Sequence, residues 1–365
     1  MTRVLQVLGR SAGGIARHVS QLAGALDGRD GLTIDVACPP DLPIPMPKPS
    51  LDLVVPDGLR GHGPAIAKLR GLVKEHRYDL VHAHGLRAGI DSAVAARGLA
   101  QVVVTVHNLV RDDIAGRRAP IDRLAEPAVV RLSDRTLAVS RDIAAHLVAA
   151  ARSSAHKVEV LYLGVGDPPQ VRRATAEVRA ELGLRSADRC LLVTVARLAP
   201  QKALPVMFEA VAGMSPRPLL AVLGEGPLEG ELRERVADLA LEEDVRFLGF
   251  RGDVADVVAA ADVFCLSSTW EGVPLSVQEA ILLGTVVVGT DVGGMSEVIT
   301  DRETGRLVAA GDSAGLRAAV AELCGSPELR ERYATRAREA LVERFSTTAM
   351  LQRLSTLYRD GVHAT

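Results

Sequence analysis

The sequence predicts an α/β protein made of two doubly wound domains, each with a parallel sheet. Short runs of Val, Leu and Ile alternate with helical patterns along the 365 residues, as in parallel strands that are buried on both faces. A chain of this length normally divides into two domains of about 150–200 residues. The segment LGVGDPPQ at residues 163–170 has the composition of a linker, and the strand pattern starts again after it.

Five strands are expected in the first half of the chain, and helices follow most of them. The helices are expected over residues 15–26, 85–98, 121–132 and 141–151. The proline-rich run at residues 39–49 is expected to be a loop. The expected strands have the sequences VLQVL, LTIDVAC, DLVHAH, VVVTVH and RTLAVS.

The second half repeats this pattern and ends in a long helix. That helix is expected over residues 327–358, with an interruption near Phe345. We therefore place the first domain at residues 1–166, the second at 167–345 and the last part of the helix at 346–365. The six expected strands have the sequences LLVTVA, PLLAVLG, VRFLGF, VFCLSS, TVVVGT and RLVA.

Composition excludes several classes of protein. The net charge of −2 argues against a nucleic-acid-binding protein. No apolar run reaches the roughly 18 residues that cross a bilayer, and the first apolar run is too short for a signal peptide. We therefore expect a soluble, cytoplasmic protein. The four cysteines show no metal-binding spacing, and Cys190 and Cys265 lie in apolar runs, so we expect both to be buried, reduced thiols.

The most informative segment runs from Ser267 to Glu297. Two glutamates, Glu271 and Glu279, are separated by seven residues, the first in a loop and the second one turn into a helix. Carboxylates bind sugar hydroxyls, and the backbone N–H groups of a helix start bind anions. The segment thus predicts a site for a sugar and a phosphate at the helix start between the two glutamates.

Glu279 also has a purely structural interpretation. Ser276 and Glu279 match the capping box S-x-x-E, in which the glutamate binds the N–H group of the capping residue. Glu271 lies in a loop and has no helix to cap, which favours a functional role for the pair.

Two cations lie on the loop after the first strand of the second half. Arg197 and Lys202, in VARLAPQKAL, follow the strand LLVTVA. A guanidinium group and an ammonium group both suit a diphosphate. The alternative is a pair of solvated loop charges, but ligands of doubly wound sheets bind beyond the carboxyl ends of the strands.

Glycines and histidines follow the strands of the first half. Gly13 and Gly14 precede a helix and allow a ligand to approach the backbone, although the motif is not GxGxxG. His107 ends the strand VVVTV, and His82 and His84 end another. Each histidine is either a site residue or a hydrogen-bonded buried side chain. Nothing in the spacing predicts a metal site.

Two further motifs in the second half are weak by themselves. Gly224, in GEGPLEGEL, follows a strand. A glycine there either allows the backbone to lie close to a nucleotide or forms an ordinary turn. Phe250 and Arg251 follow the strand VRFLGF, where they are candidates for contact with a base.

Taken together, these motifs resemble the retaining GT-B glycosyltransferases of family 4. The resemblance spans nearly the whole chain and includes His18 after the Gly-Gly pair, TVHN, AVS, VARLAPQK, GEGP, FLGF, E-x7-E, GTDVGGMSEVI and TGRLV. It implies two Rossmann-like domains with the active site in the cleft between them. The first domain would bind the acceptor and the second the sugar nucleotide, and the final helix would cross back to the first domain.

The resemblance also implies a role for each site residue. Arg197 and Lys202 would neutralise the diphosphate, and Gly14 would approach it from the other domain. Glu279 would bind the ribose, Glu271 the transferred sugar, and His107 the sugar near its reacting face. Sugar and phosphate would also be supported by the backbone of Gly272, Val273, Pro274, Leu275 and Ser276. The sequence departs from the family pattern at Ala203, where glycine is usual, and at Leu163, where asparagine is usual.

The expected reaction is transfer of a sugar, with retained configuration, from a nucleoside-diphosphate sugar to a hydroxyl group of a glycan, a lipid-linked acceptor or a small molecule. We favour UDP over GDP. No DxD-like motif lies in a suitable loop, so we expect no metal and no cofactor. One alternative is a catalytically silent regulatory or scaffold protein that binds sugar nucleotides. A dehydrogenase or epimerase would require GxGxxG or a Tyr-xxx-Lys pair, which the sequence lacks.

A basic first half raises the expectation of a weak peripheral contact with anionic membranes. Residues 1–170 carry a net charge of +4, from 21 Lys/Arg and 17 Asp/Glu. Five acidic residues are interleaved with the arginines after TVHN, so a solvated surface is the competing interpretation. Those arginines are Arg111, Arg117, Arg118, Arg123, Arg131 and Arg135.

Overall fold

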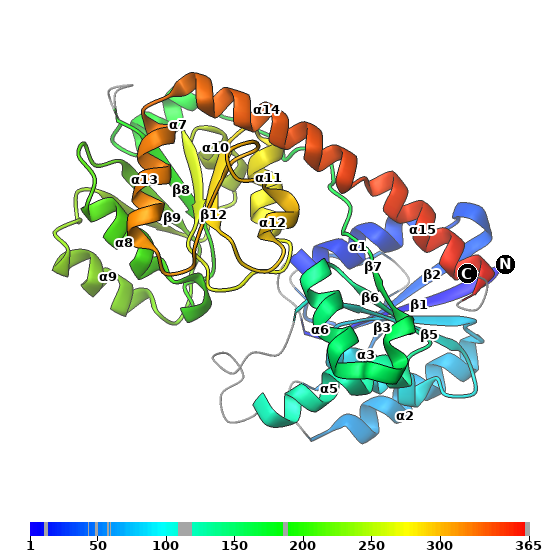
Figure 1. Cartoon of the computed structure of the whole chain (residues 1–365). Coiled ribbons are helices and arrows are strands. Elements are labelled where there is room, and N and C mark those ends of the chain that lie inside the picture. The colour runs from blue at the N-terminus through cyan, green and yellow to red at the C-terminus, as the bar shows by residue number, and fades with distance from the viewer. Residues whose placement is uncertain are drawn as a thin grey trace. The chain divides into compact units, whose positions relative to one another are not determined.

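The chain folds into two compact α/β units. The computed structural model describes residues 1–10, 14–42, 44–47, 50–56, 58, 60–108, 119–184 and 189–361. One unit contains Met1–Gly164 and Phe345–Thr365, and the other contains Val165–Arg344. Each unit has a parallel sheet between helices (Figure 1), which confirms the predicted fold class.

The first unit is built on a seven-stranded parallel sheet with the order β3-β2-β1-β4-β5-β6-β7. Its central strands are almost fully buried, which explains their continuous apolar runs. Strands β3 and β7 are short and are not predicted from the sequence. The strands are β1 (Thr2–Leu8), β2 (Leu32–Cys38), β3 (Ser50–Asp52), β4 (Leu80–His84), β5 (Gln101–Val106), β6 (Arg135–Ala138) and β7 (Val158–Val160).

In the described part of the first unit, five helices connect these strands. Four of them lie where the sequence predicts helices. The fifth, α2, has few buried residues, and its weak apolar pattern is not recognised in the sequence. The helices are α1 (Gly14–Leu26), α2 (His62–His76), α3 (Leu86–Ala95), α5 (Ala119–Leu132) and α6 (Arg141–Ala151).

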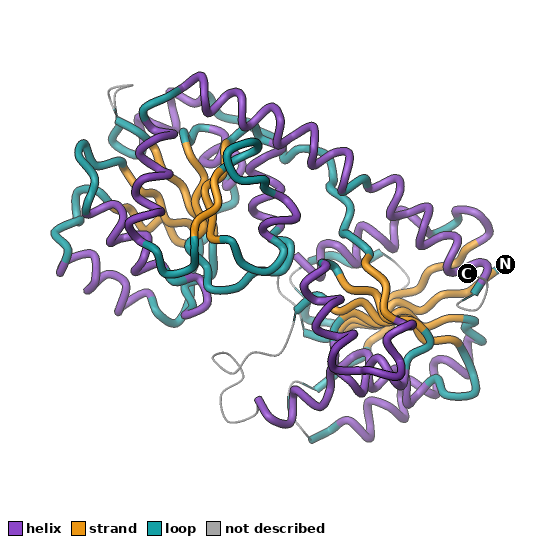
Figure 2. The backbone as a smooth tube through the Cα atoms, viewed as in Figure 1, coloured by secondary structure: helices purple, strands orange, loops and turns teal. Residues whose placement is uncertain are grey.

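The second unit has a six-stranded parallel sheet with the order β10-β9-β8-β11-β12-β13. All six strands match predicted ones, and Figure 2 shows them between helices. The strands are β8 (Leu191–Val195), β9 (Leu219–Leu223), β10 (Val245–Gly249), β11 (Val263–Leu266), β12 (Val286–Thr290) and β13 (Arg306–Val308). The helices are α7 (Thr175–Glu181), α8 (Leu204–Ala212), α9 (Glu229–Asp238), α10 (Val254–Ala259), α11 (Leu275–Leu282), α12 (Met295–Val298), α13 (Ser313–Cys324) and α14 (Pro327–Arg344).

The C-terminal helix is divided, as predicted near Phe345. Helix α14 ends at Arg344 in the second unit, and α15 (Thr347–Asp360) belongs to the first. Ser346 caps α15, because its Oγ atom accepts a hydrogen bond from the N–H group of Ala349 at 3.2 Å. Helix α15 packs on α1, β1 and β2 and buries Leu354, Leu357 and Tyr358.

Gly164 lies where the first unit meets the start of α15. A Cβ atom at this position would lie 2.5 Å from the Cα atom of Thr347. The close contact therefore requires glycine here, whereas the neighbouring Leu163 is a buried apolar residue. The departure from the family pattern at Leu163 thus leaves the required glycine in place.

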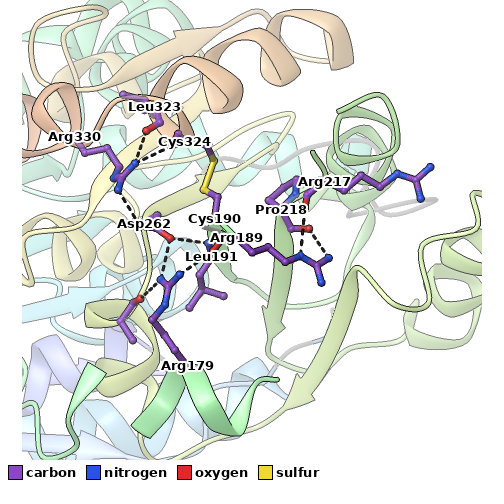
Figure 3. The surroundings of a disulfide bond; sticks show 11 residues. Arg179, Arg189, Cys190, Leu191, Arg217, Pro218, Asp262, Leu323, Cys324 and Arg330 are labelled. Carbon is purple, nitrogen blue, oxygen red and sulfur yellow. Dashed lines mark hydrogen bonds and ion pairs between the residues drawn. A yellow bond between two sulfur atoms is a disulfide. The ribbon is translucent and has the colours of Figure 1, made fainter. Parts of the chain in front are cut away.

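One cysteine expectation is wrong. Cys190 is bonded to Cys324, which lies 134 residues later, at the end of α13 (Figure 3). Asp262 stabilises the same region, since it accepts hydrogen bonds from Arg179, Arg330 and the N–H group of Leu191. Cys265 is a buried free thiol, as expected, and burial raises the pKa of that thiol.

Within the described ranges, no helix combines the length and the apolar character that crossing a bilayer requires.

Candidate active site

The charged residues Arg197, Lys202 and Glu271 lie on loops at the switch point of the second sheet. Strands β8 and β11 are neighbours, and from them the chain builds the sheet outward in opposite directions. In doubly wound sheets, ligands bind beyond the carboxyl ends of the strands at such a point. The loop after β8 carries Arg197 and Lys202, and the loop after β11 carries Glu271.

Lys202 and Glu271 meet directly. The Lys202 Nζ atom lies 2.5 Å from Glu271 Oε1, and Ser268 Oγ donates a hydrogen bond to the same oxygen at 2.5 Å. Both charged side chains are largely buried, with exposed fractions of 18% and 7%. A buried carboxylate that is paired and hydrogen-bonded is held in one position. Ser268, which the sequence analysis does not identify, is therefore part of the site.

Hydrogen bonds from side chains to backbone carbonyl groups join the two loops that carry this ion pair. Gln201 Nε2 donates to the carbonyl oxygen of Trp270 at 2.8 Å, and Ser267 Oγ donates to that of Lys202 at 2.9 Å. Ala203 follows with φ 44° and ψ 40°, a left-handed conformation that costs an alanine about 1–2 kcal/mol. The usual glycine therefore has a conformational reason, and here alanine adopts the same backbone.

The Gly293–Gly294 pair after β12 contacts the Glu271 loop. Gly293 has φ 52°, and a Cβ atom there would clash with the Glu271 carbonyl oxygen. The N–H group of Gly294 donates to that oxygen at 3.1 Å. This pair thus fixes the backbone that carries Glu271. The signal in the sequence for this contact is a Gly-Gly pair in the loop that follows a strand, three residues after the strand ends.

The capping-box interpretation of Glu279 is wrong. Helix α11 begins at Leu275 after Pro274, and no side chain caps it. Ser276 lies inside the first turn, and Glu279 lies half-buried one turn further along. The first N–H groups of α11 therefore have no side-chain cap and remain candidates for an anion. Val273 and Gly272 lie just before this start, next to Glu271.

Arg197 differs from Lys202 in its surroundings. Its side chain is exposed, and among the described residues no carboxylate is paired with it. A guanidinium group on the loop after β8 that forms no ion pair within the described ranges can bind a diphosphate without first breaking such a pair.

Gly224 lies where the loops after β8, β9 and β10 come together. It has φ 122°, and a Cβ atom there would lie 2.1 Å from the carbonyl oxygen of Ala196. Its N–H group donates to the carbonyl oxygen of Gly249 at 2.9 Å. The structure thus gives Gly224 a packing role, and its predicted contact with the nucleotide stays a prediction.

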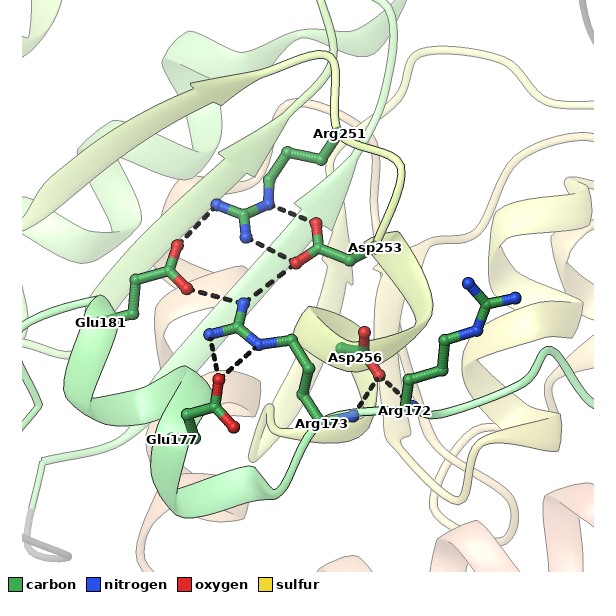
Figure 4. A network of polar contacts seen from close by, with 7 residues as sticks. All are labelled: Arg172, Arg173, Glu177, Glu181, Arg251, Asp253 and Asp256. Atoms are coloured by element: carbon green, nitrogen blue, oxygen red, sulfur yellow. Dashed lines mark hydrogen bonds and ion pairs between the residues drawn. The ribbon is translucent and has the colours of Figure 1, made fainter.

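Phe250 follows β10 with 84% of its surface exposed, as a side chain available for stacking would be. Arg251 is not available, because it is paired with Glu181 and Asp253 (Figure 4). The Arg251 guanidinium lowers the pKa of Asp253 to about 2. Arg173 joins the same carboxylates, so this network anchors the loop that carries Phe250.

His107, the predicted site residue of the first unit, belongs to a buried group of histidines. Its Nε2 atom lies 3.2 Å from His84 Nδ1. His18, on α1, has its ring centroid 6.0 Å from those of both His84 and His107. In the first sheet the switch point falls between β1 and β4, and these histidines lie at the carboxyl ends of β4 and β5 or on the helix after β1.

These histidines are neutral at physiological pH. Burial lowers the pKa of His18 to about 4 and that of His82 to about 3, and it lowers those of His84 and His107 well below the usual value. Neutral imidazole has one donor and one acceptor nitrogen, so His107 is suited to binding a hydroxyl group.

Some predicted residues lie outside the described ranges. Gly13 and the arginines at 111, 117 and 118 are among them. Gly14 is described and begins α1. In the part of the chain that the structure describes, no group of three or more His, Cys, Asp or Glu side chains is placed to hold a metal ion.

Two family models match the two halves of the chain. The model "Glycosyltransferase Family 4" matches residues 12–167, and the model "Glycosyl transferases group 1" matches residues 177–340. Each match falls almost entirely within one of the two units.

Individual proteins agree with these models. A D-inositol 3-phosphate glycosyltransferase from Saccharomonospora viridis is 32% identical over 310 residues, 79% of this chain and 71% of that protein. An N-acetyl-alpha-D-glucosaminyl L-malate synthase from Bacillus anthracis is 27% identical over 205 residues, 56% of this chain and 54% of that protein. The match to LpsE of Rhizobium meliloti likewise spans about half of that relative, 55%.

Among solved structures, HepE from Anabaena in complex with UDP has a TM-score of 0.83 at 22% identity and covers 99% of this chain and 100% of its own. This likeness shows the fold. Together with the sequence matches, it establishes that this chain belongs to the group 1, family 4 glycosyltransferases with the GT-B fold.

Proposed function

We propose that this chain transfers a sugar from a nucleoside-diphosphate sugar to a hydroxyl acceptor, with retention of configuration and without a metal ion. The observation that carries the proposal is the Lys202–Glu271 pair at the switch point. The loop of Lys202 also carries the exposed Arg197, which has no carboxylate partner among the described residues, and the uncapped start of α11 follows Glu271 in the chain. This combination offers cations to a diphosphate and a carboxylate to a sugar.

We favour UDP as the nucleotide. HepE, which shares this fold, has been solved with UDP and with UDP-glucose. In our proposal Glu279 binds the ribose, and the backbone from Gly272 to Ser276 binds phosphate and sugar. Phe250 borders the base.

The chemistry follows from the charge that develops on the leaving group. Breaking the anomeric C–O bond leaves negative charge on the diphosphate and positive charge on the sugar. Arg197, Lys202 and the N–H groups of α11 stabilise the diphosphate, each such donor contributing about 2.7–4 kcal/mol in comparable sites. The leaving phosphate accepts the proton of the acceptor hydroxyl, and attack from the same face retains the configuration.

A panel of sugar nucleotides tests this function. We would incubate the purified protein with UDP-glucose, UDP-galactose, UDP-N-acetylglucosamine and GDP-mannose, with excess EDTA or with Mg²⁺. Release of nucleoside diphosphate in EDTA, and a raised melting temperature with the matching nucleotide, are expected. Release that requires Mg²⁺ would contradict metal independence. Binding without release under both conditions would favour the catalytically silent alternative.

The acceptor side is proposed more coarsely. A hydroxyl acceptor on a lipid carrier agrees with the basic first half of the chain and with weak attachment to anionic membranes. Sedimentation with anionic vesicles at low salt tests this attachment. Protein that stays in the supernatant would favour a soluble acceptor.

A further inference from the structure

A continuous set of polar side chains lies buried beneath the carboxyl ends of β1, β4 and β5. Residues two apart on a strand share one face of the sheet, so His82 and His84 lie on the same face. Helix α15 packs on β1 and adds the buried Tyr358. The set consists of Gln6, His82, His84, Thr105, His107 and Tyr358, each with an exposed fraction of 6% or less.

The Gln6 amide determines which atoms donate and which accept in the hydrogen bonds that join Gln6, His84 and His107. Its oxygen lies 2.7 Å from His84 Nε2, and an amide oxygen only accepts, so His84 carries its proton on Nε2. His84 is neutral, because burial lowers the pKa of its imidazole. Its Nδ1 atom is therefore an acceptor, and His107 Nε2, 3.2 Å away, is the donor.

The other half runs in the same direction through Tyr358. The Gln6 amide nitrogen donates to the Tyr358 hydroxyl oxygen at 2.9 Å. Tyr358 then directs its own proton to His82 Nδ1 at 2.5 Å. His82 is neutral as well, so its Nε2 atom carries the proton and donates to Thr105 Oγ1 at 2.7 Å. Reversing one of these hydrogen bonds alone would place two donor groups or two acceptor groups opposite each other.

The opposite direction requires every hydrogen bond in this series, from His107 to Thr105, to exchange donor and acceptor. If the Gln6 amide turned over, its nitrogen would face His84 Nε2. His107 Nε2 would then accept the hydrogen bond from His84 instead of donating it. In that reversed arrangement Tyr358 would donate to the Gln6 amide oxygen and accept from His82 Nδ1. The direction is therefore selected by the Gln6 amide, whose nitrogen faces the Tyr358 hydroxyl oxygen at 2.9 Å. The Tyr358 hydroxyl group thus acts on His107 from a different element of the fold, through Gln6 and His84.

We propose that Tyr358 on α15 is a positioning residue that holds His107 with its proton on Nε2. The Nδ1 atom of His107 is then an acceptor for a substrate hydroxyl group. The functional part of this inference rests on the proposed function and on the contact between His107 and the transferred sugar that the family resemblance implies. The assignment of the proton does not, and it can be tested without any substrate.

Nitrogen NMR tests the proton assignment. We would label the nine histidines with ¹⁵N and record long-range ¹H–¹⁵N correlations, identifying His107 by the signals lost in His107→Asn. The wild-type chain should show His107 as the Nε2–H tautomer, and Tyr358→Phe should show a mixture of tautomers. An Nδ1–H tautomer in the wild type, or an unchanged spectrum in Tyr358→Phe, would overturn the proposal.

Kinetics test the consequence for the site. With the best sugar nucleotide, Tyr358→Phe should lower kcat about tenfold while KM for the donor changes by less than twofold. Gln6→Leu should have the same effect on kcat. The double variant should lower kcat no further than Gln6→Leu alone, because both residues act through the same series of hydrogen bonds. Tyr333→Phe is the matched control, since Tyr333 is buried on α14 outside this set, and it should leave kcat unchanged.

The outcomes separate this inference from the proposed function. If no donor reacts with the wild-type chain, the proposed function fails and the NMR result still decides the role of Tyr358. If the wild-type chain is active and additive losses appear in the double variant, the linkage through Gln6 is wrong. Equal losses in Tyr358→Phe and Tyr333→Phe would mean that only packing is being measured.

Discussion

At the scale of single residues, the site depends on how each charge is partnered. Lys202 is paired with Glu271 at 2.5 Å, whereas Arg197 is exposed and has no carboxylate partner among the described residues. A diphosphate would therefore bind Arg197 directly and would share Lys202 with Glu271. Both cations act on the leaving group in the proposed reaction, but Lys202 also holds Glu271 in position.

Removing either cation should slow transfer. We expect Arg197→Ala and Lys202→Ala each to lower kcat by roughly 10²–10³, because each removes a group that stabilises the developing negative charge. Arg338→Ala, an exposed arginine on α14, is the matched control and should retain full activity. Initial rates with saturating donor measure the effect. A folded Arg197→Ala or Lys202→Ala variant with normal turnover would refute the assignment.

Glu279 can be tested separately through nucleotide binding. Since no capping box forms, Glu279→Gln should affect binding more than folding. We expect UDP affinity to fall by about 1–3 kcal/mol, the value of a hydrogen bond to a charged group. Glu339→Gln, an exposed glutamate on α14, serves as the control. Isothermal titration with UDP decides, and equal affinities for both variants would count against the ribose role.

At the scale of elements, the loops after four strands of the second sheet support one another. The loop after β8 contacts those after β9 and β11, and the loop after β12 contacts that of Glu271. Glycines occupy the crossings because backbone atoms approach there more closely than a Cβ atom allows. The position of Glu271 therefore depends on residues that never contact a substrate.

Gly293→Ala should show this dependence. Its φ of 52° and the clash of a new Cβ atom with Glu271 should lower the free energy of unfolding by about 1–3 kcal/mol and weaken UDP-sugar binding by displacing Glu271. Gly230→Ala, on α9 with open space around it, is the control and should leave binding unchanged. Denaturant unfolding and titration measure both effects. Unaltered binding in a stable Gly293→Ala protein would show that Glu271 needs no such support.

At the scale of the whole molecule, two long-range connections organise the units. Cys190 and Cys324 link the start of β8 to the end of α13 across 134 residues. Helix α15 returns the end of the chain to the first unit, where Tyr358 reaches the buried histidines. Each connection joins segments that are far apart in sequence.

Reduction of the disulfide should destabilise the second unit. A cross-link across so long a loop typically stabilises by about 2–4 kcal/mol, so a reducing agent should lower the melting temperature of this unit by roughly 10 °C. Scanning calorimetry with and without reductant measures this. The Cys190→Ser/Cys324→Ser variant should melt at the reduced temperature in both conditions. Identical melting of the wild-type protein with and without reductant would show that the bond contributes little.

The sequence by itself determined the order of strands and helices and the loops that carry the site. Apolar runs and helix starts are local patterns, so β8, β11 and the break at Ser346 can be located within a few residues. Parallel strands place their following loops at one edge of a sheet. This geometry was enough to predict that Arg197, Lys202 and Glu271 belong to one site.

Only the tertiary structure decided which side chains are partners. The Lys202–Glu271 pair, the Cys190–Cys324 bond and the Tyr358–His82 contact join residues 69, 134 and 276 positions apart. The start of α11 at Leu275 rather than after Ser276 was likewise decided only by the folded structure. Such contacts arise from strand order and helix packing, which bring distant segments together, and no local pattern in the chain encodes them.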